Sequence, residues 1–396
     1  MSAMKRLFQL MADKKASDIF LSVGAPINIK INGVAMPVNQ TMLNADAVRT
    51  LLYEVLNEKQ IREYEDEMEM NTAYALDGVG AFRISAFRQK GSPAVVVRFI
   101  PGDVPKFDTL GLPGVLKEII MQKRGLILMV GATGSGKSTS LSAMLDLRNE
   151  QKSGHILTLE DPVEFIFKNK KSIVNQREVG TDTKSFETAL KNALRQAPDC
   201  ILIGEIRDKQ TMGMALAYAQ SGHLALATLH ANNSYHAMNR IISFYPLENR
   251  PTLLLDLSAA LQAIVSQRLV RTKTGARRAA VEVLLNTRHI AELIEKGDVN
   301  EIKDAMEKSM SPGSQTFEQS LFSMFMDGSI TQDECMANAD SATNMLWLIN
   351  QATAGTISVG GSAPAPADKK DEKKDAALST TTGGASFSDF KIDASV

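Results

Sequence analysis

The chain has 396 residues, of which 44% are hydrophobic and 22% are charged, and its formal net charge is -1. This length accommodates two or three domains with separate cores, and the composition is that of a soluble globular protein. The charge excludes a global attraction to nucleic acid or anionic membrane, and no apolar run is long enough to span a bilayer. The two cysteines, Cys200 and Cys335, lack metal-binding spacing and fit a reducing cytoplasm.

The first hundred residues mix helix and strand patterns, which predicts a small α+β domain over residues 1–100. Apolar residues recur at helical spacing over 4–12, and one or two helices are expected over 43–64. Asn32-Gly33 is a hairpin turn signal before a short strand at 34–36. Alternation of apolar and polar residues predicts further strands over 18–23, 27–31, 81–87 and 94–100.

A break follows at residues 101–105, where Pro and Gly predict a linker that we place at 101–112. Strands then alternate with helices in the segment 113–350, which predicts an α/β domain with a mostly parallel sheet. The expected strands are 126–130, 155–159, 200–204 and 224–228. The expected helices are 113–123, 137–148, 186–193 and 209–220, and residues from 250 onward are expected to be mainly helical. Small and polar residues dominate 351–396, which predicts a disordered tail.

A phosphate-binding motif follows the first strand of this second domain. Residues 131–138, Gly-Ala-Thr-Gly-Ser-Gly-Lys-Ser, match GxxxxGK[ST] at every position and open a predicted helix. Glycines let backbone N–H groups surround phosphate oxygens, and the helix N-terminus adds partial positive charge. Lys137 is expected to neutralise the β- and γ-phosphates, and Ser138 to offer its hydroxyl to Mg²⁺. The predicted nucleotide-binding residues are Gly131, Ala132, Thr133, Gly134, Ser135, Gly136, Lys137, Ser138 and Thr139.

Acidic residues follow two later strands, and P-loop hydrolases need carboxylates to hold Mg²⁺ and to orient water. Glu160, Asp161 and Glu164 follow strand 155–159, and Glu205 follows strand 200–204. Ligands of doubly wound sheets bind beyond the carboxyl ends of the strands, so these acids are expected near the γ-phosphate. Any one of them alone could equally be a solvated loop residue.

Histidines and arginines supply further candidates. His223 and His230 flank an apolar strand and point to opposite faces, so they cannot share one metal ion. Each could be structural, and one is a candidate sensor of the nucleotide state. Arg83, Arg88 and Arg98 lie on strands of the first domain. They are either ordinary exposed residues, which the residues alone favour, or an arginine finger for a neighbouring subunit.

Four motifs in this order resemble those of the secretion ATPase superfamily that drives type II secretion and type IV pili. They are the P-loop at 131–138, the Asp box at 158–165, the Walker B stretch at 194–207 and the His box at 221–231. The resemblance extends over roughly residues 4–350. It implies a homo-hexamer of PAS-like first domains and RecA-like P-loop domains, with ATP and Mg²⁺ bound between subunits.

The resemblance also implies roles for single residues. Glu205 would support Mg²⁺ together with Ser138. Glu164, the last acid of the Asp box, would polarise the attacking water, with Glu160 as the second candidate. His230 would contact the nucleotide as part of the His box.

The arginines and the C-terminal segment refine the resemblance. Arg83 and Arg98 match arginines that reach a neighbour's phosphates, which favours the finger over the ordinary role. The short first domain and the lack of a tetracysteine zinc site resemble retraction rather than assembly ATPases. Within that branch, residues 315–325 are closer to the PilU type than to the PilT type. This implies an accessory motor for pilus retraction and twitching motility, on the cytoplasmic side of the inner membrane. Its partners would be a PilT-type ATPase and an inner-membrane platform protein.

Three alternatives stay open. A RecA-like nucleic-acid motor needs a basic channel, and the net charge of -1 without an evident Lys/Arg stripe disfavours it, so no nucleic-acid partner is expected. A non-catalytic nucleotide-binding ring scaffold is disfavoured by the intact Lys137, Ser138, Glu164 and Glu205. An assembly ATPase of the same family is disfavoured by the missing cysteines.

Overall fold

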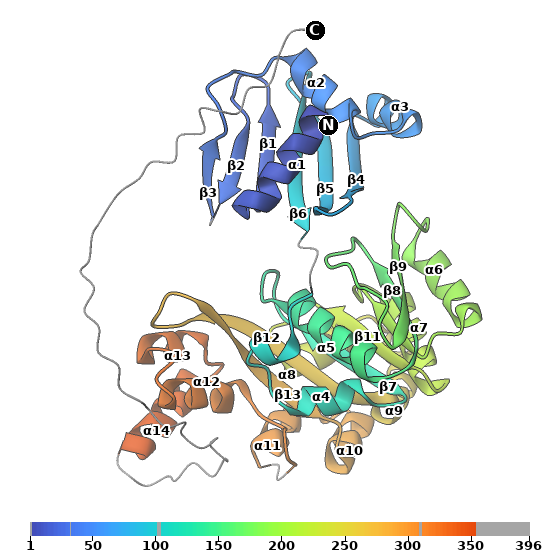
Figure 1. Cartoon of the computed structure of the whole chain (residues 1–396). Coiled ribbons are helices and arrows are strands. Elements are labelled where there is room, and N and C mark those ends of the chain that lie inside the picture. The colour runs from blue at the N-terminus through green and yellow to red at the C-terminus, as the bar shows by residue number, and fades with distance from the viewer. Residues whose placement is uncertain (1, 32, 101–103, 309–310, 354–396) are drawn as a thin grey trace. The chain divides into compact units, whose positions relative to one another are not determined.

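The computed structural model describes residues 2–31, 33–100, 104–308 and 311–353. They form two compact units, residues 2–100 and residues 104–350, each with its own sheet (Figure 1). Among these described residues, no helix is long and apolar enough to cross a membrane.

The first unit is an antiparallel sheet with helices packed on one face. Its strands run in the order β3-β2-β1-β6-β5-β4. The apolar face of α1 packs against the sheet, where the Phe8 ring stacks on Phe82 with centroids 4.1 Å apart. The strands are β1 (Asp18–Ser22), β2 (Asn28–Ile31), β3 (Val34–Pro37), β4 (Glu69–Leu76), β5 (Gly80–Gln89) and β6 (Ser92–Ile100). The helices are α1 (Ala3–Lys14), α2 (Ala45–Tyr53) and α3 (Glu58–Glu67).

The expected α+β character of this unit is confirmed, and the expected strands lie within one or two residues of β1, β2, β5 and β6. The hairpin between β2 and β3 is also present, with Ile31 paired to Val34. Of its turn signal, Asn32 lies outside the described residues. β4 was not predicted, because its outward face carries Glu69, Asn71 and two alanines, which blur the apolar alternation.

The second unit is built on a seven-stranded sheet in the order β13-β12-β7-β11-β10-β8-β9. All neighbours are parallel except β12 and β13, which form an antiparallel hairpin at one edge. The predicted α/β fold class is therefore confirmed. The strands are β7 (Gly125–Val130), β8 (Gly154–Glu160), β9 (Ser172–Glu178), β10 (Cys200–Ile203), β11 (Leu224–Leu229), β12 (Leu261–Arg271) and β13 (Arg277–Leu285).

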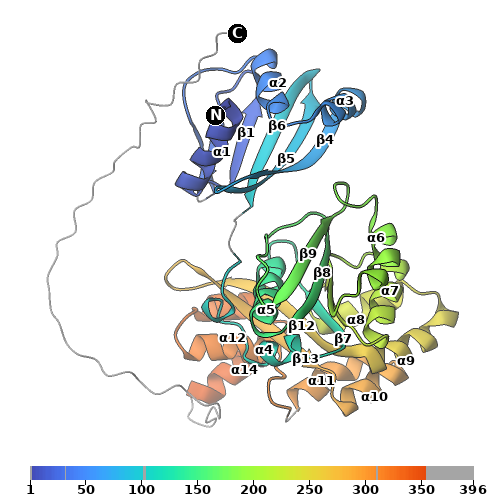
Figure 2. The same ribbon diagram turned by 45° about the vertical axis from the view of Figure 1, so that its right-hand side comes forward.

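Helices cover both faces of this sheet, which explains why a strand such as β7 is apolar and buried at every position (Figure 1 and Figure 2). One face carries α4 (Val115–Ile120) and α5 (Lys137–Gln151). The other carries α6 (Phe186–Ala193), α7 (Lys209–Gln220), α8 (Ser234–Ser243), α9 (Arg250–Ala260), α10 (Arg288–Lys296) and α11 (Ile302–Glu307). The chain then adds α12 (Phe317–Met326), α13 (Gln332–Asn338) and α14 (Ala342–Thr353) beside the β12–β13 hairpin. Short 3₁₀ turns are η1 (Phe107–Thr109), η2 (Leu194–Gln196), η3 (Leu247–Asn249) and η4 (Val299–Glu301).

The expectation of mainly helical structure after residue 250 is wrong for β12 and β13, which together form a long hairpin. Polar and apolar residues do not alternate regularly over 267–271, Gln-Arg-Leu-Val-Arg, so the segment lacks the usual pattern of a strand. The reason is that both faces of β12 are covered, one by the P-loop and the other by the C-terminal helices. β9, a partly exposed edge strand, was missed for the same lack of alternation.

Segments outside the two cores match the expected boundaries only in part. Of the expected linker, residues 101–103 lie outside the described residues, whereas Phe107 is buried in the core under α4 and α5. The expected tail begins at 351, but α14 extends to Thr353. The remaining residues 354–396 lie outside the described part of the chain.

Candidate nucleotide-binding site

The P-loop connects β7 to α5 through three glycines with positive φ, which are Gly131, Gly134 (φ 79°) and Gly136. Gly131 has φ 156° and Gly136 has φ 84°, both in the left-handed range. A Cβ atom at Gly131 would lie 2.6 Å from the carbonyl oxygen of Gln267. The exposed tip is Ala132, Thr133 and Gly134, while Ser138 and Thr139 are half-buried in the first turn of α5. The loop therefore has the close backbone approach that a phosphate cradle needs.

A buried glutamine of β12 fixes the P-loop to the sheet through hydrogen bonds. Gln267 is 2% exposed, and its Nε2 donates a 2.8 Å hydrogen bond to the Ser135 carbonyl. Its Oε1 accepts from Ser140 Oγ at 2.7 Å, which joins the loop to α5. Sequence reasoning missed Gln267, because β12 itself was not predicted.

The P-loop lysine lies inside the loop. Lys137 Nζ donates to the carbonyl oxygens of Gly131 at 2.7 Å and Ala132 at 2.9 Å. Burial lowers the pKa of the Lys137 ammonium, and the carboxylates of Glu205 and Glu164 oppose that shift through their attraction. The structure thus brings the predicted lysine within electrostatic reach of two predicted acids, which come from the ends of different strands.

The Asp box follows β8 and presents Glu160 and Glu164 in different environments. Glu160 is buried, and its Oε1 accepts from Thr158 Oγ1 at 2.7 Å and from Gln176 Nε2 at 3.3 Å. Burial raises the pKa of Glu160, although these hydrogen bonds and the Glu164 backbone N–H oppose the rise. Glu164 is exposed, as is Asp161, so their carboxylates are accessible to solvent whereas that of Glu160 is not. Gln176 also donates to the Phe165 carbonyl at 2.8 Å, which fixes the box to β9.

Replacing Glu160 with glutamine is expected to stabilise the fold at alkaline pH. Because the folded-state pKa of Glu160 lies above the ordinary value of 4.5, its contribution to stability is greatest below that value and is lost as the pH rises. The Tm of Glu160→Gln relative to wild type should therefore rise as the pH rises above about 4.5. Thermal melts across this range test it; a difference that shrinks with rising pH would contradict the assignment.

Glu205 follows β10 and forms a small charged cluster with two neighbours. Arg207 Nε donates to Glu205 Oε2 at 2.7 Å, and His230 Nε2 lies 3.5 Å from Glu205 Oε1. Burial lowers the pKa of His230, and the positive charge of Lys137 lowers it further. Near neutral pH His230 is therefore an uncharged imidazole that can exchange hydrogen bonds with Glu205 or with a phosphate. His223 lies at the other end of β11, near Ser221 Oγ at 3.0 Å, and takes no part in this cluster.

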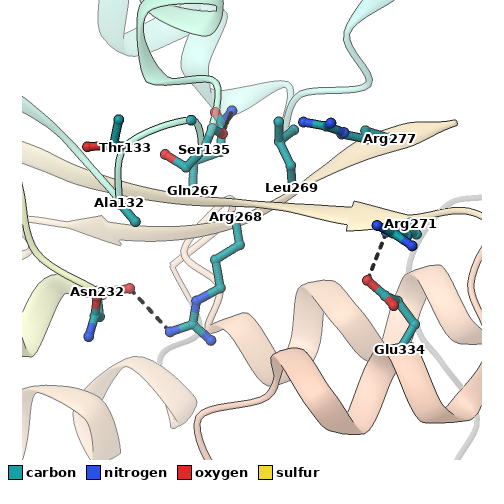
Figure 3. A pocket seen from close by; sticks show the side chains of 11 residues that line it. Ala132, Thr133, Ser135, Asn232, Gln267, Arg268, Leu269, Arg271, Arg277 and Glu334 are labelled. Atoms are coloured by element: carbon teal, nitrogen blue, oxygen red, sulfur yellow. Dashed lines mark hydrogen bonds between the residues drawn. The ribbon is translucent and has the colours of Figure 1, made fainter. Parts of the chain in front are cut away.

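A cavity of about 360 Å³ opens beside the P-loop (Figure 3). Its walls come from the loop tip, from the segment after β11, from the hairpin and from α13. The lining residues are Ala132, Thr133, Gly134, Ser135, Asn232, Gln267, Arg268, Leu269, Arg271, Arg277 and Glu334. Arg271 pairs directly with Arg277 across the hairpin. The basic segment 268–278 escaped the sequence analysis, which found no Lys/Arg stripe.

The first unit carries the predicted finger arginines on one face of its sheet. Arg98 on β6 pairs with Arg83 on β5, and Asp18 on β1 lies on the other side of Arg98. Arg98 Nε donates to Asp18 Oδ1 at 2.9 Å, although the Arg98 side chain stays 63% exposed. Like charges directly opposite each other are destabilising, and the Asp18 carboxylate beside Arg98 offsets part of that repulsion.

A Mg²⁺ ion fits the donors at this site. Ser138 would supply a hydroxyl and Glu205 a carboxylate, and both are the hard oxygen ligands that Mg²⁺ prefers beside phosphate oxygens. Within the described ranges, no group of three or more His, Cys, Asp or Glu side chains is placed to hold a metal alone.

A P-loop at the end of β7, acids at the ends of β8 and β10, and a histidine after β11 define a P-loop nucleoside triphosphatase. The family model described as type II/IV secretion system protein matches residues 2–337. The chain is 48% identical to the type IV pilus ATPase PilU of Pseudomonas aeruginosa, over 87% of this chain and 91% of that protein. It is 38% identical to the pilus retraction ATPase PilT of the same organism, over 85% of this chain and 98% of that protein. The chain therefore belongs to the type II/IV secretion system protein family.

Solved structures give the same result. The pilus retraction motor PilT with bound ADP has a TM-score of 0.82 and 38% identity, over 88% of this chain and 99% of that chain. The ATPase DotB of Legionella pneumophila has a TM-score of 0.73 and 26% identity, over 84% and 93%. These matches confirm that the chain is a nucleotide-binding ATPase of the PilT/PilU branch. The roles of single site residues stay predictions.

Proposed function

We propose that this chain is an ATP-hydrolysing motor subunit of a type IV pilus machine, active in pilus retraction as an accessory to a PilT-type ATPase. The observation that carries the proposal is the Lys137 ammonium, which lies within the P-loop and is attracted by both Glu205 and Glu164. The 48% identity to a pilus ATPase over nearly its whole length supports the pilus assignment. The presence of Lys137, Glu164 and Glu205 favours ATP hydrolysis over the alternative of a non-catalytic nucleotide-binding scaffold.

The chemistry assigned to each residue follows from its place. Lys137 and the P-loop N–H groups bind the β- and γ-phosphates, and Ser138 and Glu205 hold Mg²⁺, which would neutralise charge on those phosphates. The exposed Glu164 is the group that orients and polarises the attacking water. His230, neutral and beside Glu205, senses whether the γ-phosphate is present.

Mechanical work requires that hydrolysis change a contact between parts of the motor. We place the chain in a homo-hexameric ring in which Arg83 and Arg98 of one subunit reach the phosphates of its neighbour. Binding of ATP then draws two subunits together, and release of phosphate lets them separate. Repeated around the ring, these closures would act on an inner-membrane platform protein from the cytoplasmic side.

Arg83→Ala is expected to lower turnover by about 10³-fold or more while leaving nucleotide affinity nearly unchanged, as for other arginine fingers. If the finger acts in trans, mixing Arg83→Ala subunits with Lys137→Ala subunits should restore part of the activity. In such a ring an intact P-loop can meet an intact arginine from the next subunit. Phosphate release by the mixture, compared with each variant alone, measures this. If the mixture releases phosphate no faster than each variant alone, the finger does not act in trans.

The accessory role has a separate test. The ATPase rate should be measured for the purified chain, for a PilT-type partner and for the two together. Pilus retraction should be measured in cells that contain one or both proteins. We expect the pair to exceed the sum of the single rates. Retraction by this chain alone would assign it an independent role, and DNA-stimulated turnover would revive the nucleic-acid motor, for which segment 268–278 would be the contact.

A further inference from the structure

Arg268 on β12 joins the segment after β11 to the C-terminal helices. Its guanidinium donates to the backbone carbonyl of Asn232 at 3.2 Å and to that of Asn338 at the end of α13. It also forms an ion pair with Asp340 and lies 4.0 Å from the ring centroid of Phe317 on α12. One side chain on a core strand therefore contacts three separate segments, and Figure 3 shows the contact with Asn232 beside the P-loop cavity.

Asp340 completes the link from the opposite side. Its second carboxylate oxygen accepts from Asn233 Nδ2 at 2.7 Å. Asn233 is 8% exposed, and its Oδ1 caps α8 by accepting from the His236 backbone N–H at 2.9 Å. The segment from His230 to Asn233 is thus held at one end by the nucleotide site and at the other by Asp340.

Asp340 is also placed where α13 and α14 meet. It lies in the turn between α13 and α14, where the next backbone N–H, of Ser341, donates to Glu318 at 3.0 Å. Sulfur atoms of Cys335 on α13 and Met345 on α14 lie 3.4 Å apart in the core. The two helices are therefore packed together, and their junction is attached to the segment that follows His230.

Resting on the nucleotide site proposed above, we propose that Arg268 is a positioning residue that couples the nucleotide state to α13 and α14 through Asp340. A change at His230 would move the 230–233 segment, and the Arg268–Asp340 pair would carry that movement into the C-terminal helices. The Arg268 side chain is 22% exposed and the Asp340 side chain 15% exposed, so water screens the attraction between them only weakly. The planar guanidinium donates to Asn338 from Nη1 and to Asn232 and Asp340 from Nη2, a fixed spread of donors that the single nitrogen of a lysine does not reproduce.

The chain carries its own reporter for this coupling. Trp347 is the single tryptophan of the sequence, and it lies 56% exposed on α14. In the full chain, Trp347 emission should change on addition of Mg-ATP or Mg-ADP. The apparent Kd should equal that from equilibrium dialysis with labelled nucleotide. For Arg268→Gln and Asp340→Asn, we expect the emission change to fall below about a fifth of the wild-type amplitude, while the dialysis Kd stays within about threefold.

Turnover gives a second readout. Arg268→Gln should lower kcat by about tenfold with little change in KM, because the residue acts on the response to nucleotide and not on its binding. Arg268→Lys, which keeps the charge and disturbs folding least, should give an intermediate emission change. If Arg268→Gln fails to assemble, the Lys and Asn variants still decide the question, since full wild-type responses from both would overturn the proposal.

The matched control is Arg278→Gln. Arg278 also joins the hairpin to the C-terminal helices, through Asp327 at 2.7 Å and Ser329 Oγ at 2.6 Å, but it does not touch the segment after β11. This variant should keep the wild-type emission change. The proposal is overturned if Arg278→Gln loses the signal as fully as Arg268→Gln, or if wild type binds nucleotide without any change at Trp347. Absence of nucleotide binding by wild type in dialysis would overturn the proposed function itself.

Discussion

Lys137→Ala is expected to abolish ATP turnover and to weaken Mg-ATP affinity by about 100-fold or more. Removing one partner of a buried charge-assisted contact costs about 2–5 kcal/mol, and each 1.4 kcal/mol is tenfold in affinity. The substitution also leaves the carbonyl oxygens of Gly131 and Ala132 without the ammonium that they bond in this structure. Steady-state phosphate release and equilibrium dialysis with labelled ATP measure the two effects.

Lys152→Ala is the appropriate control for that experiment. Lys152 follows the same helix α5 at its other end, where its Nζ donates to the Met121 carbonyl at 3.1 Å. Its removal changes the net charge equally but leaves the P-loop intact, so activity should stay near wild type. Turnover by Lys137→Ala at the rate of Lys152→Ala would exclude the P-loop as the hydrolytic site.

Glu164→Gln is expected to separate binding from hydrolysis. Glutamine keeps the size of the side chain but cannot accept a proton, so the hydrolytic step should slow by about 10²–10⁴-fold. ATP affinity should change little, because Glu164 is exposed and Lys137 keeps its contacts with the P-loop carbonyls. Single-turnover hydrolysis by protein preloaded with Mg-ATP measures the step directly.

Glu160→Gln distinguishes the two candidates for the base. The Glu160 carboxylate is buried and accepts hydrogen bonds from Thr158 and Gln176, so it is less accessible to a water molecule than the exposed Glu164. We therefore expect Glu160→Gln to retain more activity than Glu164→Gln. Normal turnover by Glu164→Gln would remove that residue from catalysis, and a complete loss confined to Glu160→Gln would transfer the role to Glu160.

The central part of the site was predictable from the sequence because its signals are local. The P-loop requires glycines and a lysine at fixed spacing between a strand and a helix, and β7 and α5 begin within a residue of the expected positions. The acids could be located because β10 is a continuous apolar strand, and β8 is buried in its second half, where only Thr158 interrupts the apolar residues before Glu160. Their common edge follows from the topology of such sheets.

The supporting residues could not be predicted, because their partners are distant in the sequence. Gln267 braces Ser135 across 132 positions, and Arg268 meets Asp340 across 72. No local pattern marks these pairs, and the β12–β13 hairpin that positions them was expected to be helical. The roles proposed for Arg83 and Arg98 depend on a neighbouring subunit, so sequence pattern alone favoured ordinary exposed arginines.

The most direct test of the account is nucleotide binding by the purified full chain, measured by equilibrium dialysis with and without Mg²⁺ at concentrations spanning monomer and ring. We expect saturable ATP binding that Mg²⁺ strengthens and that Lys137→Ala removes. A wild-type protein without Mg²⁺-dependent nucleotide affinity in any oligomeric form would contradict the assignment of a P-loop motor.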